Sequence, residues 1–490
     1  MQNMKPTRFE VVALLITSVV ITYYLFVPPI IGLADSGDFE RILPWRGLAH
    51  VSNNFNDKYF SYFNSRYRII PRVKEPDWYK TSTSLLIMPA RWFSIRIGQD
   101  QFFDIRILAA VHALIFLCGF WLILVSMRSI RLCLRIILSA LLIVIFADVG
   151  YIAYFNSFFS EGTALCFLAV AIGCALILIN RQSTRGIFLF GYFAAIGLML
   201  TSKPMYIPLT PALALLGLHL SRYVSYSRRY WLSVCAAVGL CLTAAWYFYQ
   251  TPRILNIHSI YIGLFLDLLP NSPHPQDDLT ELGLNPNYAL FSGTTPYQID
   301  SPLNDPRFEL DFSSKVSSLT LPLFYLKHPS RLYDLSTRCV KYAFSTRVER
   351  LGYYESHTGK PPLSKPFGIW SNIRENLFPR SLWFFVSFSA TGIVAIVLLL
   401  KTSSNIAKGM YFLYVLFVFI ASSQFLVAIL VGGGESDVEK HLFMFNLAFD
   451  VCLILLVLGA ANLLQTSNLQ FISKLTRFRI LRPHRSNHVT

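Results

Sequence analysis

Long runs of apolar residues recur along this chain, and they constrain its fold more than any other feature. About ten of these runs approach the roughly 20 residues that a helix needs to cross the hydrocarbon core of a membrane. A helix satisfies its own backbone hydrogen bonds in lipid, so each run predicts a membrane-spanning helix. The predicted spans are residues 9–27, 105–127, 134–149, 162–180, 186–202, 204–220, 230–250, 382–400, 409–431 and 442–464. We therefore predict an all-α polytopic membrane protein.

Residue usage agrees with this class, because 54% of the chain is hydrophobic and only 14% is charged. In a soluble domain about a quarter of all residues are charged. The first apolar run has no small-residue cleavage site, so we expect a retained anchor and not a cleaved signal peptide. Seven of the eight cysteines fall in or beside predicted spans, which leaves Cys339 without a disulfide partner in an outer loop. The sequence has no Cys/His cluster with zinc-ligand spacing.

The basic excess of the chain predicts which ends of the spans face the cytoplasm. There are 43 Lys and Arg residues against 27 Asp and Glu residues. With the N-terminus inside, the predicted inner segments hold 17 of the basic residues and a single acid, Glu10, which leaves 26 basic and 26 acidic residues elsewhere. This one-sided excess follows the positive-inside rule, so we expect both termini to be cytoplasmic. Topology and anionic membrane lipid then explain the basic charge, and nucleic acid is not an expected partner.

The spans divide the chain into predicted parts of different character. These are a seven-span bundle (1–250) that includes a first outer loop (28–103), a large extracytoplasmic loop region (251–381), a three-span bundle (382–464) and a basic cytoplasmic tail (465–490). Within the first outer loop, residues 81–97 mix apolar residues with Arg and Trp, which is typical of a helix that lies in the membrane interface. Pro89 predicts a break in that helix.

An acidic motif follows the first span and the Pro28-Pro29 pair: Asp35-Ser36-Gly37-Asp38-Phe39-Glu40-Arg41. Gly37 permits a tight turn, so Asp35 and Asp38 are expected to face the same point. Two carboxylates at one point suit a general base, or a divalent cation that binds a phosphate-bearing substrate. The alternative is an ordinary solvated loop that begins with an Asx turn.

Other ionisable residues also lie at the predicted outer ends of spans. Glu161 begins the fourth span, where it either binds substrate or only complements the helix dipole. Lys203 lies in the tight hairpin between the fifth and sixth spans, where it either contacts a phosphate or snorkels to the headgroup level. Asp450 is a carboxylate inside the last span, and thus a functional or structural polar contact. This one-sided placement predicts a cavity that opens outward beneath the large loops.

Three short motifs carry a resemblance to a known superfamily. Residues 32–39, residues 155–161 (Phe-Asn-Ser-Phe-Phe-Ser-Glu) and the pair Lys440-His441 are similar to motifs of bacterial polytopic proteins assigned to glycan biosynthesis. With its first outer loop after span one, the chain resembles a GT-C-type integral membrane glycosyltransferase. The resemblance covers the membrane-embedded body of the chain, and it implies a bacterial inner (cytoplasmic) membrane protein.

The resemblance also implies a reaction. Such enzymes transfer a sugar from a polyprenyl-phosphate-linked donor to a glycan or lipid acceptor on the extracytoplasmic face. Asp35 or Asp38 would be the general base, and both would bind Mg²⁺ or Mn²⁺ if the enzyme is metal-dependent, as a diphosphate leaving group would favour. The implied substrate-binding residues are Glu40, Arg41, Asn156, Glu161, Lys203, Lys440 and His441. Two alternatives remain: a surface-polysaccharide polymerase or ligase, and a lipid-linked glycan flippase or other transporter.

Overall fold

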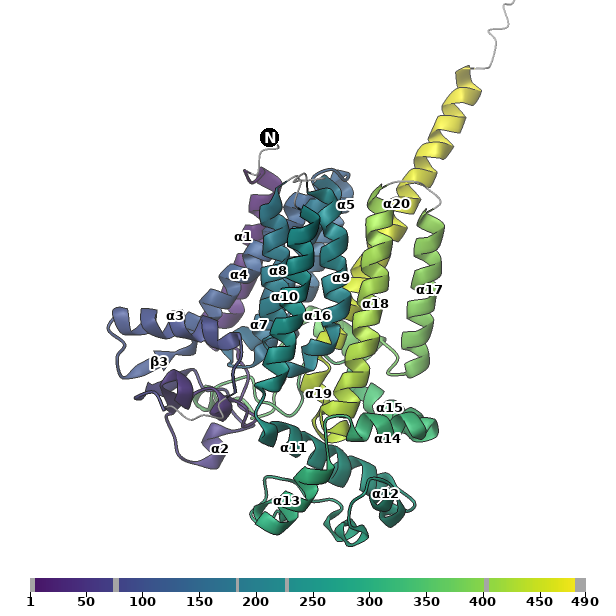
Figure 1. The fold of residues 1–490 in the computed structure, drawn as a ribbon. Coiled ribbons are helices and arrows are strands. Elements are labelled where there is room, and N and C mark those ends of the chain that lie inside the picture. The colour runs from purple at the N-terminus through teal and green to yellow at the C-terminus, as the bar shows by residue number, and fades with distance from the viewer. Residues whose placement is uncertain (1–4, 74–78, 182–184, 225–228, 401–404, 481–490) are drawn as a thin grey trace, which may run out of the picture.

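The structure is a computed structural model that describes residues 5–73, 79–181, 185–224, 229–400 and 405–480. Long helices run side by side in one bundle, with the N-terminus and the C-terminal part of the last helix at the same end (Figure 1). These helices are α1 (Arg8–Phe26), α4 (Ile105–Ser126), α5 (Leu132–Phe146), α7 (Ser160–Arg181), α8 (Gly186–Leu200), α9 (Thr210–Leu220), α10 (Arg229–Tyr249), α17 (Leu382–Leu400), α18 (Asn405–Val431) and α20 (Phe443–Ile480). The prediction of an all-α polytopic membrane fold is confirmed.

Each of the ten predicted spans coincides with one of these helices. By length and composition alone, the described residues contain eight helices that suit a membrane crossing, or up to ten if each of two bent pairs is one span. α8 is short for a span at 15 residues. Residues 253–271 pass the same test although we predicted an outer loop there. Figure 1 shows α11 (Arg253–Tyr261) outside the bundle, at the end opposite the termini.

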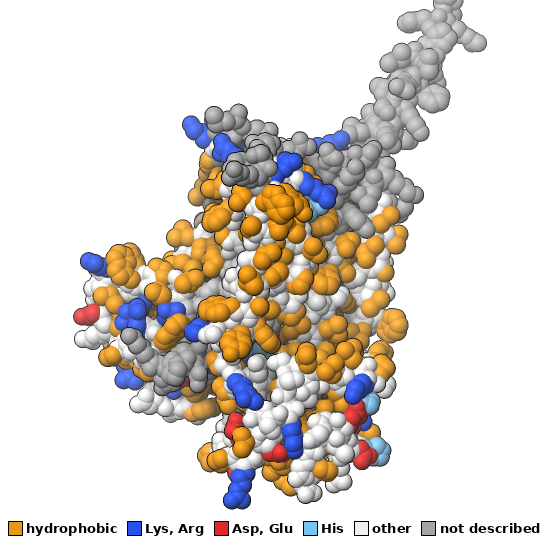
Figure 2. Space-filling model, viewed as in Figure 1, with side chains coloured by type: hydrophobic (Ala, Val, Ile, Leu, Met, Phe, Trp, Pro, Cys, Tyr) orange, Lys and Arg blue, Asp and Glu red, His pale blue; other side chains and the backbone are white. Residues whose placement is uncertain are grey.

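The surface of the molecule has the charge pattern of a membrane protein. On the face in Figure 2, hydrophobic side chains cover the middle of the bundle. Lys and Arg lie at both ends of this face, whereas the visible Asp and Glu lie only toward the end opposite the termini. Glu10, the one acid predicted on the inner side, is fully buried and pairs with Arg128, the residue two positions after α4. An ion pair thus explains why this carboxylate lies at the basic end.

The first outer segment contains a small sheet that the sequence analysis did not predict. Its strands are β1 (Leu48–His50), β2 (Arg66–Ile69) and β3 (Phe102–Asp104), and β2 pairs antiparallel with both neighbours. α2 (Phe55–Lys58) lies in the connection between β1 and β2, and α3 (Thr83–Arg96) lies between β2 and β3. The sheet brings the acidic motif, α3 and the start of α4 into one layer at the end of the bundle.

The predicted break at Pro89 is wrong, because α3 runs through this proline without interruption. Proline removes one helical hydrogen bond and commonly breaks a helix at a cost of about 3 kcal/mol. Here Pro89 lies on the exposed face, while Leu86, Ile87 and Ala90 on the other face are buried. Packing of that buried face against α4 offsets the lost hydrogen bond.

The second outer segment consists of short helices, and all but the last of them lie below the bundle in Figure 1. They are α11, α12 (Pro275–Glu281), α13 (Pro306–Lys315), α14 (Thr320–Lys327), α15 (Pro329–Ala343) and α16 (Ile369–Leu377). A single-turn helix α6 (Val149–Ile152) and 3₁₀ turns at Phe39–Arg41, Ala153–Asn156 and Pro204–Leu209 lie at the predicted outer ends of the spans. Another single-turn helix, α19 (Val438–His441), precedes α20.

Asp450 has a structural role. Its carboxylate accepts hydrogen bonds from the Tyr151 hydroxyl at 2.5 Å, from Trp370 Nε1 at 2.9 Å and from Arg374 Nη1 at 2.7 Å. All four side chains are buried, so this network joins α6, α16 and α20 without contact to water. A buried charge pair that is fully hydrogen-bonded in this way fixes how the helices pack.

Candidate functional site

The acidic motif forms a tight turn around the buried carboxylate of Asp35. Its Oδ1 accepts from the backbone N–H groups of Gly37 at 2.7 Å and Phe39 at 3.0 Å. Gly37 has φ +95°, a conformation that favours glycine. Burial raises the pKa of Asp35, and hydrogen bonds from His50 and Phe39 only partly offset this effect. The Asx turn of the alternative interpretation is therefore present, but Asp35 is 2% exposed and is not solvated.

Asp38 lies on the other side of the turn and is bound by two cations. Arg41 Nη1 lies 2.7 Å from its Oδ1, and Lys440 Nζ lies 2.7 Å from its Oδ2. The Asp38 side chain is 25% exposed. Burial acts to raise the pKa of Asp38, but the charges of Lys440 and Arg41 outweigh it and hold the pKa well below its usual value. Asp38 is thus an ionised carboxylate at neutral pH, and both it and Arg41 are partly exposed.

A second ion pair joins Glu161 to Lys203. Lys203 Nζ lies 2.6 Å from Glu161 Oε1 and 3.0 Å from His441 Nδ1. Glu161 is 2% exposed and Lys203 is 14% exposed at the side chain. Lys203 thus points into the protein and does not snorkel to the headgroup level. Glu161 starts α7, and it pairs with a cation in addition to any effect on the helix dipole.

These two ion pairs belong to one cluster. Lys440 and His441 are consecutive in α19, and Lys203 contributes to the low pKa of Asp38. The cluster therefore gathers residues from the first outer segment, the start of α7, the hairpin after α8 and the residues before α20. Its cations Arg41, Lys203 and Lys440 outnumber its carboxylates Asp38 and Glu161. A cluster with an excess of positive charge, partly buried at the end of a membrane bundle, suits an anionic group such as a phosphate.

Glu40 belongs to a second group that includes His50, a residue that sequence analysis missed. Glu40 accepts from the Tyr59 hydroxyl at 2.8 Å and pairs with Lys58 at 2.7 Å. These partners outweigh burial and lower the pKa of Glu40. His50 Nε2 lies 3.1 Å from Asp35 Oδ2 and 3.9 Å from Glu40. The sequence signal for His50 was a lone histidine 15 residues after Asp35, and only strand β1 brings the two together.

Asn156 is a further predicted site residue that has no hydrogen bond to the charged cluster among the described contacts. Its Nδ2 donates to the backbone carbonyls of Leu25 at 3.1 Å and Ile31 at 2.8 Å. Its side chain is fully buried. Asn156 therefore holds the end of α1 and the start of the acidic segment, and its predicted substrate contact stays a prediction.

The second outer segment covers part of the cluster. The Tyr297 hydroxyl lies 3.5 Å from Arg41 Nη2. The ring of Tyr297 also packs edge-on against His258 of α11 at 5.3 Å between centroids. Burial and the positive charge of Arg41 lower the pKa of His258. Sequence analysis had no signal for the contact between Arg41 and Tyr297, because these residues are 256 positions apart.

The donor set of the acidic motif does not fit a preformed divalent-cation site. Both oxygens of Asp35 accept hydrogen bonds, and both oxygens of Asp38 pair with cationic nitrogens. Mg²⁺ and Mn²⁺ prefer several free oxygen ligands in one place. Within the described part of the chain, no three His, Cys, Asp or Glu side chains are grouped closely enough to hold a metal ion. We therefore derive no step through a metal, and the predicted Mg²⁺ or Mn²⁺ site stays a prediction.

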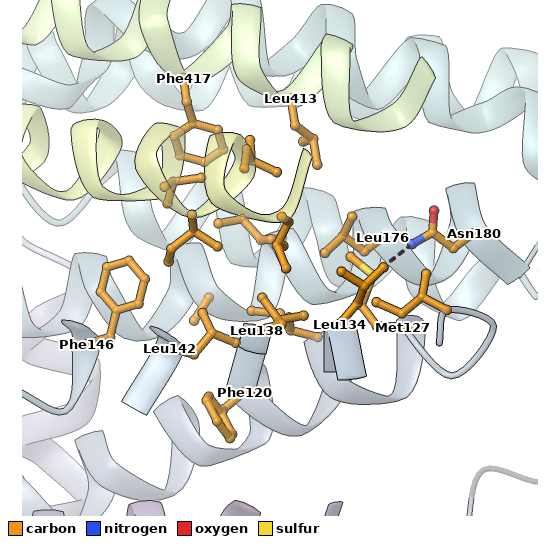
Figure 3. Close-up of a pocket in the computed structure, with 18 of the residues that line it drawn as sticks. Phe120, Met127, Leu134, Leu138, Leu142, Phe146, Leu176, Asn180, Leu413 and Phe417 are labelled. Atoms are coloured by element: carbon orange, nitrogen blue, oxygen red, sulfur yellow. Dashed lines mark hydrogen bonds between the residues drawn. The ribbon is translucent and has the colours of Figure 1, made fainter. Parts of the chain in front are cut away.

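A cavity of about 360 Å³ lies inside the bundle between α4, α5, α7, α18 and α20. Figure 3 shows Leu138 of α5 opposite Leu413 and Phe417 of α18. At one end Asn180 donates to Met127 Sδ at 3.4 Å. Among the described residues, none of the predicted site residues lines this cavity. Apolar cavities stay dry, so this one suits a hydrocarbon chain and not a chemical step.

The fold and the charged cluster together define an all-α multi-pass membrane protein with a buried ionic site at one end of its bundle. The family model described as "YfdI N-terminal transmembrane domain" matches residues 1–474. The chain therefore belongs to this family. No curated protein and no solved structure shows significant similarity to the chain.

Proposed function

We propose that the protein is a membrane-embedded glycosyltransferase. It transfers a sugar from a polyprenyl-phosphate-linked donor to a glycan or lipid acceptor on the extracytoplasmic face. The observation that carries this proposal is the cluster of Arg41, Lys203 and Lys440 around the accessible carboxylate of Asp38. Cations that bind a phosphate beside a base are what sugar transfer from a lipid phosphate requires.

In this proposal Asp38 is the general base. Asp38 takes the proton of an acceptor hydroxyl, and the acceptor oxygen bonds to the anomeric carbon of the donor sugar. The bond between that carbon and the phosphate oxygen breaks, and polyprenyl phosphate leaves with the electron pair. Arg41, Lys203 and Lys440 stabilise the charge on the leaving phosphate. A phosphate that binds to Arg41 and Lys440 also weakens their hold on Asp38, which raises its pKa toward the range of a working base.

Asp35 is then a positioning residue. It holds the turn through Gly37 and Phe39 and is too buried to touch an acceptor. His50 holds the second oxygen of Asp35 and so fixes the orientation of the carboxylate. His441 contacts Lys203 and would reach the phosphate from the same side.

The apolar cavity supports a lipid substrate. Burial of hydrocarbon in a cavity of this size is favourable, and the lining is mostly aliphatic and aromatic, with Ser129, Arg131, Asn180 and Asn462 as its polar residues. A transporter would more often have its polar groups near the middle of the membrane, on broken helices. Here the one intramembrane carboxylate that sequence analysis singled out, Asp450, has hydrogen-bond partners within the protein.

The test is sugar transfer by the purified full chain in vesicles that contain a labelled polyprenyl-phosphate sugar. Asp38→Asn should reduce kcat by about 10²-fold or more, the usual scale for a general base. Asp57→Asn is the matched control, because Asp57 is an exposed acid of the same outer segment whose carboxylate accepts from the Ser52 hydroxyl. Full activity of Asp38→Asn overturns its role as base. Movement of the lipid across the bilayer without a new glycosidic bond would instead assign a flippase, and chain growth of a polysaccharide would assign a polymerase or ligase.

A further inference from the structure

Three arginines of the first outer segment lie around Gly47. Arg46 precedes Gly47, Arg72 follows β2, and Arg91 lies in α3. A Cβ atom placed on Gly47 would lie 3.1 Å from Arg91 Nη2 and 3.2 Å from Arg72 Cγ. The segments are held together by backbone hydrogen bonds, such as that from the N–H of Ile70 to the carbonyl of Gly47 at 2.9 Å. Arg72 and Arg91 therefore flank Gly47, and the charge of Arg72 acts on both Arg46 and Arg91.

The charges of these arginines are not compensated by carboxylates among the described residues. Arg46 is 8% exposed, and its Nε has no hydrogen-bond partner there; the buried Nε of Arg91 has none either. Burial, with repulsion from Arg72, lowers the pKa of Arg46 to about 10. The same two causes lower the pKa of Arg91. Buried charges are normally paired, whereas the buried Arg46 has no carboxylate partner in the part of the chain that the structure describes.

The other buried arginines of the described chain show the usual arrangement. Arg347 pairs with Glu375 at 2.8 Å, and Arg374 pairs with Asp450 at 2.7 Å. Arg46 is buried as well, yet the described charge that acts on its pKa is that of another arginine, Arg72. Arg46 makes a cation–π contact with Trp45, and its Cζ lies 4.0 Å from the centre of that ring. A cation–π contact stabilises a guanidinium but does not neutralise it.

The position of α3 indicates which anion is available to Arg46, Arg72 and Arg91. α3 projects sideways from the bundle (Figure 1), and Leu85, Trp92 and Phe93 on it are more than half or about half exposed. Figure 2 shows Lys and Arg side chains beside hydrophobic side chains over this part of the molecule. A helix with exposed apolar residues and flanking arginines lies at the boundary between lipid chains and headgroups. The guanidinium fork fits phosphate oxygens in two parallel hydrogen bonds.

We propose that Arg46, Arg72 and Arg91 bind the phosphate group of an anionic membrane lipid in the leaflet against which α3 rests. The site is distinct from the cluster around Asp38, because the described cations that pair with Asp38 are Arg41 and Lys440 and not these three arginines. It does not depend on the glycosyltransferase proposal. Its ligand holds the first outer segment against the membrane through its headgroup, while the exposed side chains of α3 contact its acyl chains.

The test measures lipid binding to the purified full chain by native mass spectrometry, with phosphatidylglycerol as the probe. Arg72→Ala and Arg91→Ala should each reduce the affinity for this lipid about tenfold, the effect of losing a charged hydrogen bond. Arg66→Ala should leave it unchanged, because Arg66 is an exposed arginine of the same segment on β2 and lies outside the cluster. Arg72 is itself exposed, so its loss should not unfold the protein.

Two further arms distinguish the sources of phosphate. Millimolar inorganic phosphate should not displace the lipid, because the lipid is also held by its chains. The lipid should also raise the melting temperature of the wild type more than that of the Arg72→Ala and Arg91→Ala variants. Equal lipid binding by wild type, Arg72→Ala and Arg91→Ala overturns the site. Displacement of the lipid by inorganic phosphate overturns the lipid assignment and makes free phosphate the ligand.

Discussion

The ion pair between Lys203 and Glu161 offers a test that separates donor binding from structural support. The two charged atoms lie 2.6 Å apart, and the Glu161 side chain is 2% exposed. Lys203→Ala leaves this buried carboxylate without its cation, which costs about 3–5 kcal/mol of folding free energy. If Lys203 also binds the donor phosphate, the lost charged contact is worth about 1.5–3 kcal/mol, which lowers kcat/KM for the donor about 10–100-fold.

A double variant separates these two effects. Lys203→Met combined with Glu161→Gln removes both charges at nearly constant volume, so the folding free energy should return to within about 1 kcal/mol of the wild type. The donor kinetics should not recover, because the phosphate still lacks its cation. Stability is measured by denaturation in detergent, and kinetics by initial rates at varied donor and fixed acceptor. Glu161→Gln alone reports what Glu161 contributes to either quantity.

The outcomes of this experiment are distinct. Recovery of both stability and donor kinetics in the double variant would mean that Lys203 acts only as the partner of Glu161, and the phosphate role would be wrong. Unchanged donor kinetics in Lys203→Ala would have the same meaning. Lys203→Arg should not restore the donor kinetics, because a wider guanidinium does not fit between Glu161 and His441.

Three further predictions concern other features of the structure. Asp38 has a depressed pKa, so its ion pairs stabilise the fold above its unfolded pKa of about 3.9, and this stabilisation is lost as pH falls through the lower folded value. At pH 7 the Asp38→Asn variant should therefore be less stable than the wild type, and acid denaturation curves should show this difference vanish at low pH. Leu138→Trp, which fills the cavity, should raise KM for a long-chain donor but not for a short-chain analogue, whereas Ile136→Trp on the exposed face of α5 should change neither. An alkaline phosphatase reporter should be active within residues 251–381 and inactive at the C-terminus, and the opposite pattern would reverse the assigned sidedness of the site.

The sequence by itself determined the class of the fold. Each span is a local property, because a helix in lipid satisfies its own hydrogen bonds and needs only enough apolar residues to cross. The ten predicted runs therefore coincide with helices. The same reasoning found Asp38, Glu161 and Lys203, since an ionisable residue beside an apolar run stands out in a sequence. It failed at Pro89, where packing of the buried face of α3 outweighed a local preference.

Only the tertiary structure decided which of these residues meet. Lys440 reaches Asp38 across 402 positions, and His441 reaches Lys203 across 238. The pairing of Asp35 with His50 needed strand β1, and the meeting of Arg46, Arg72 and Arg91 needed the backbone contacts around Gly47. Asn156 carried the same sequence signal as its neighbours but holds backbone carbonyls instead. The physical reason is that an ion pair depends on the order in which helices pack and on the paths of the segments between them, and no local pattern encodes either.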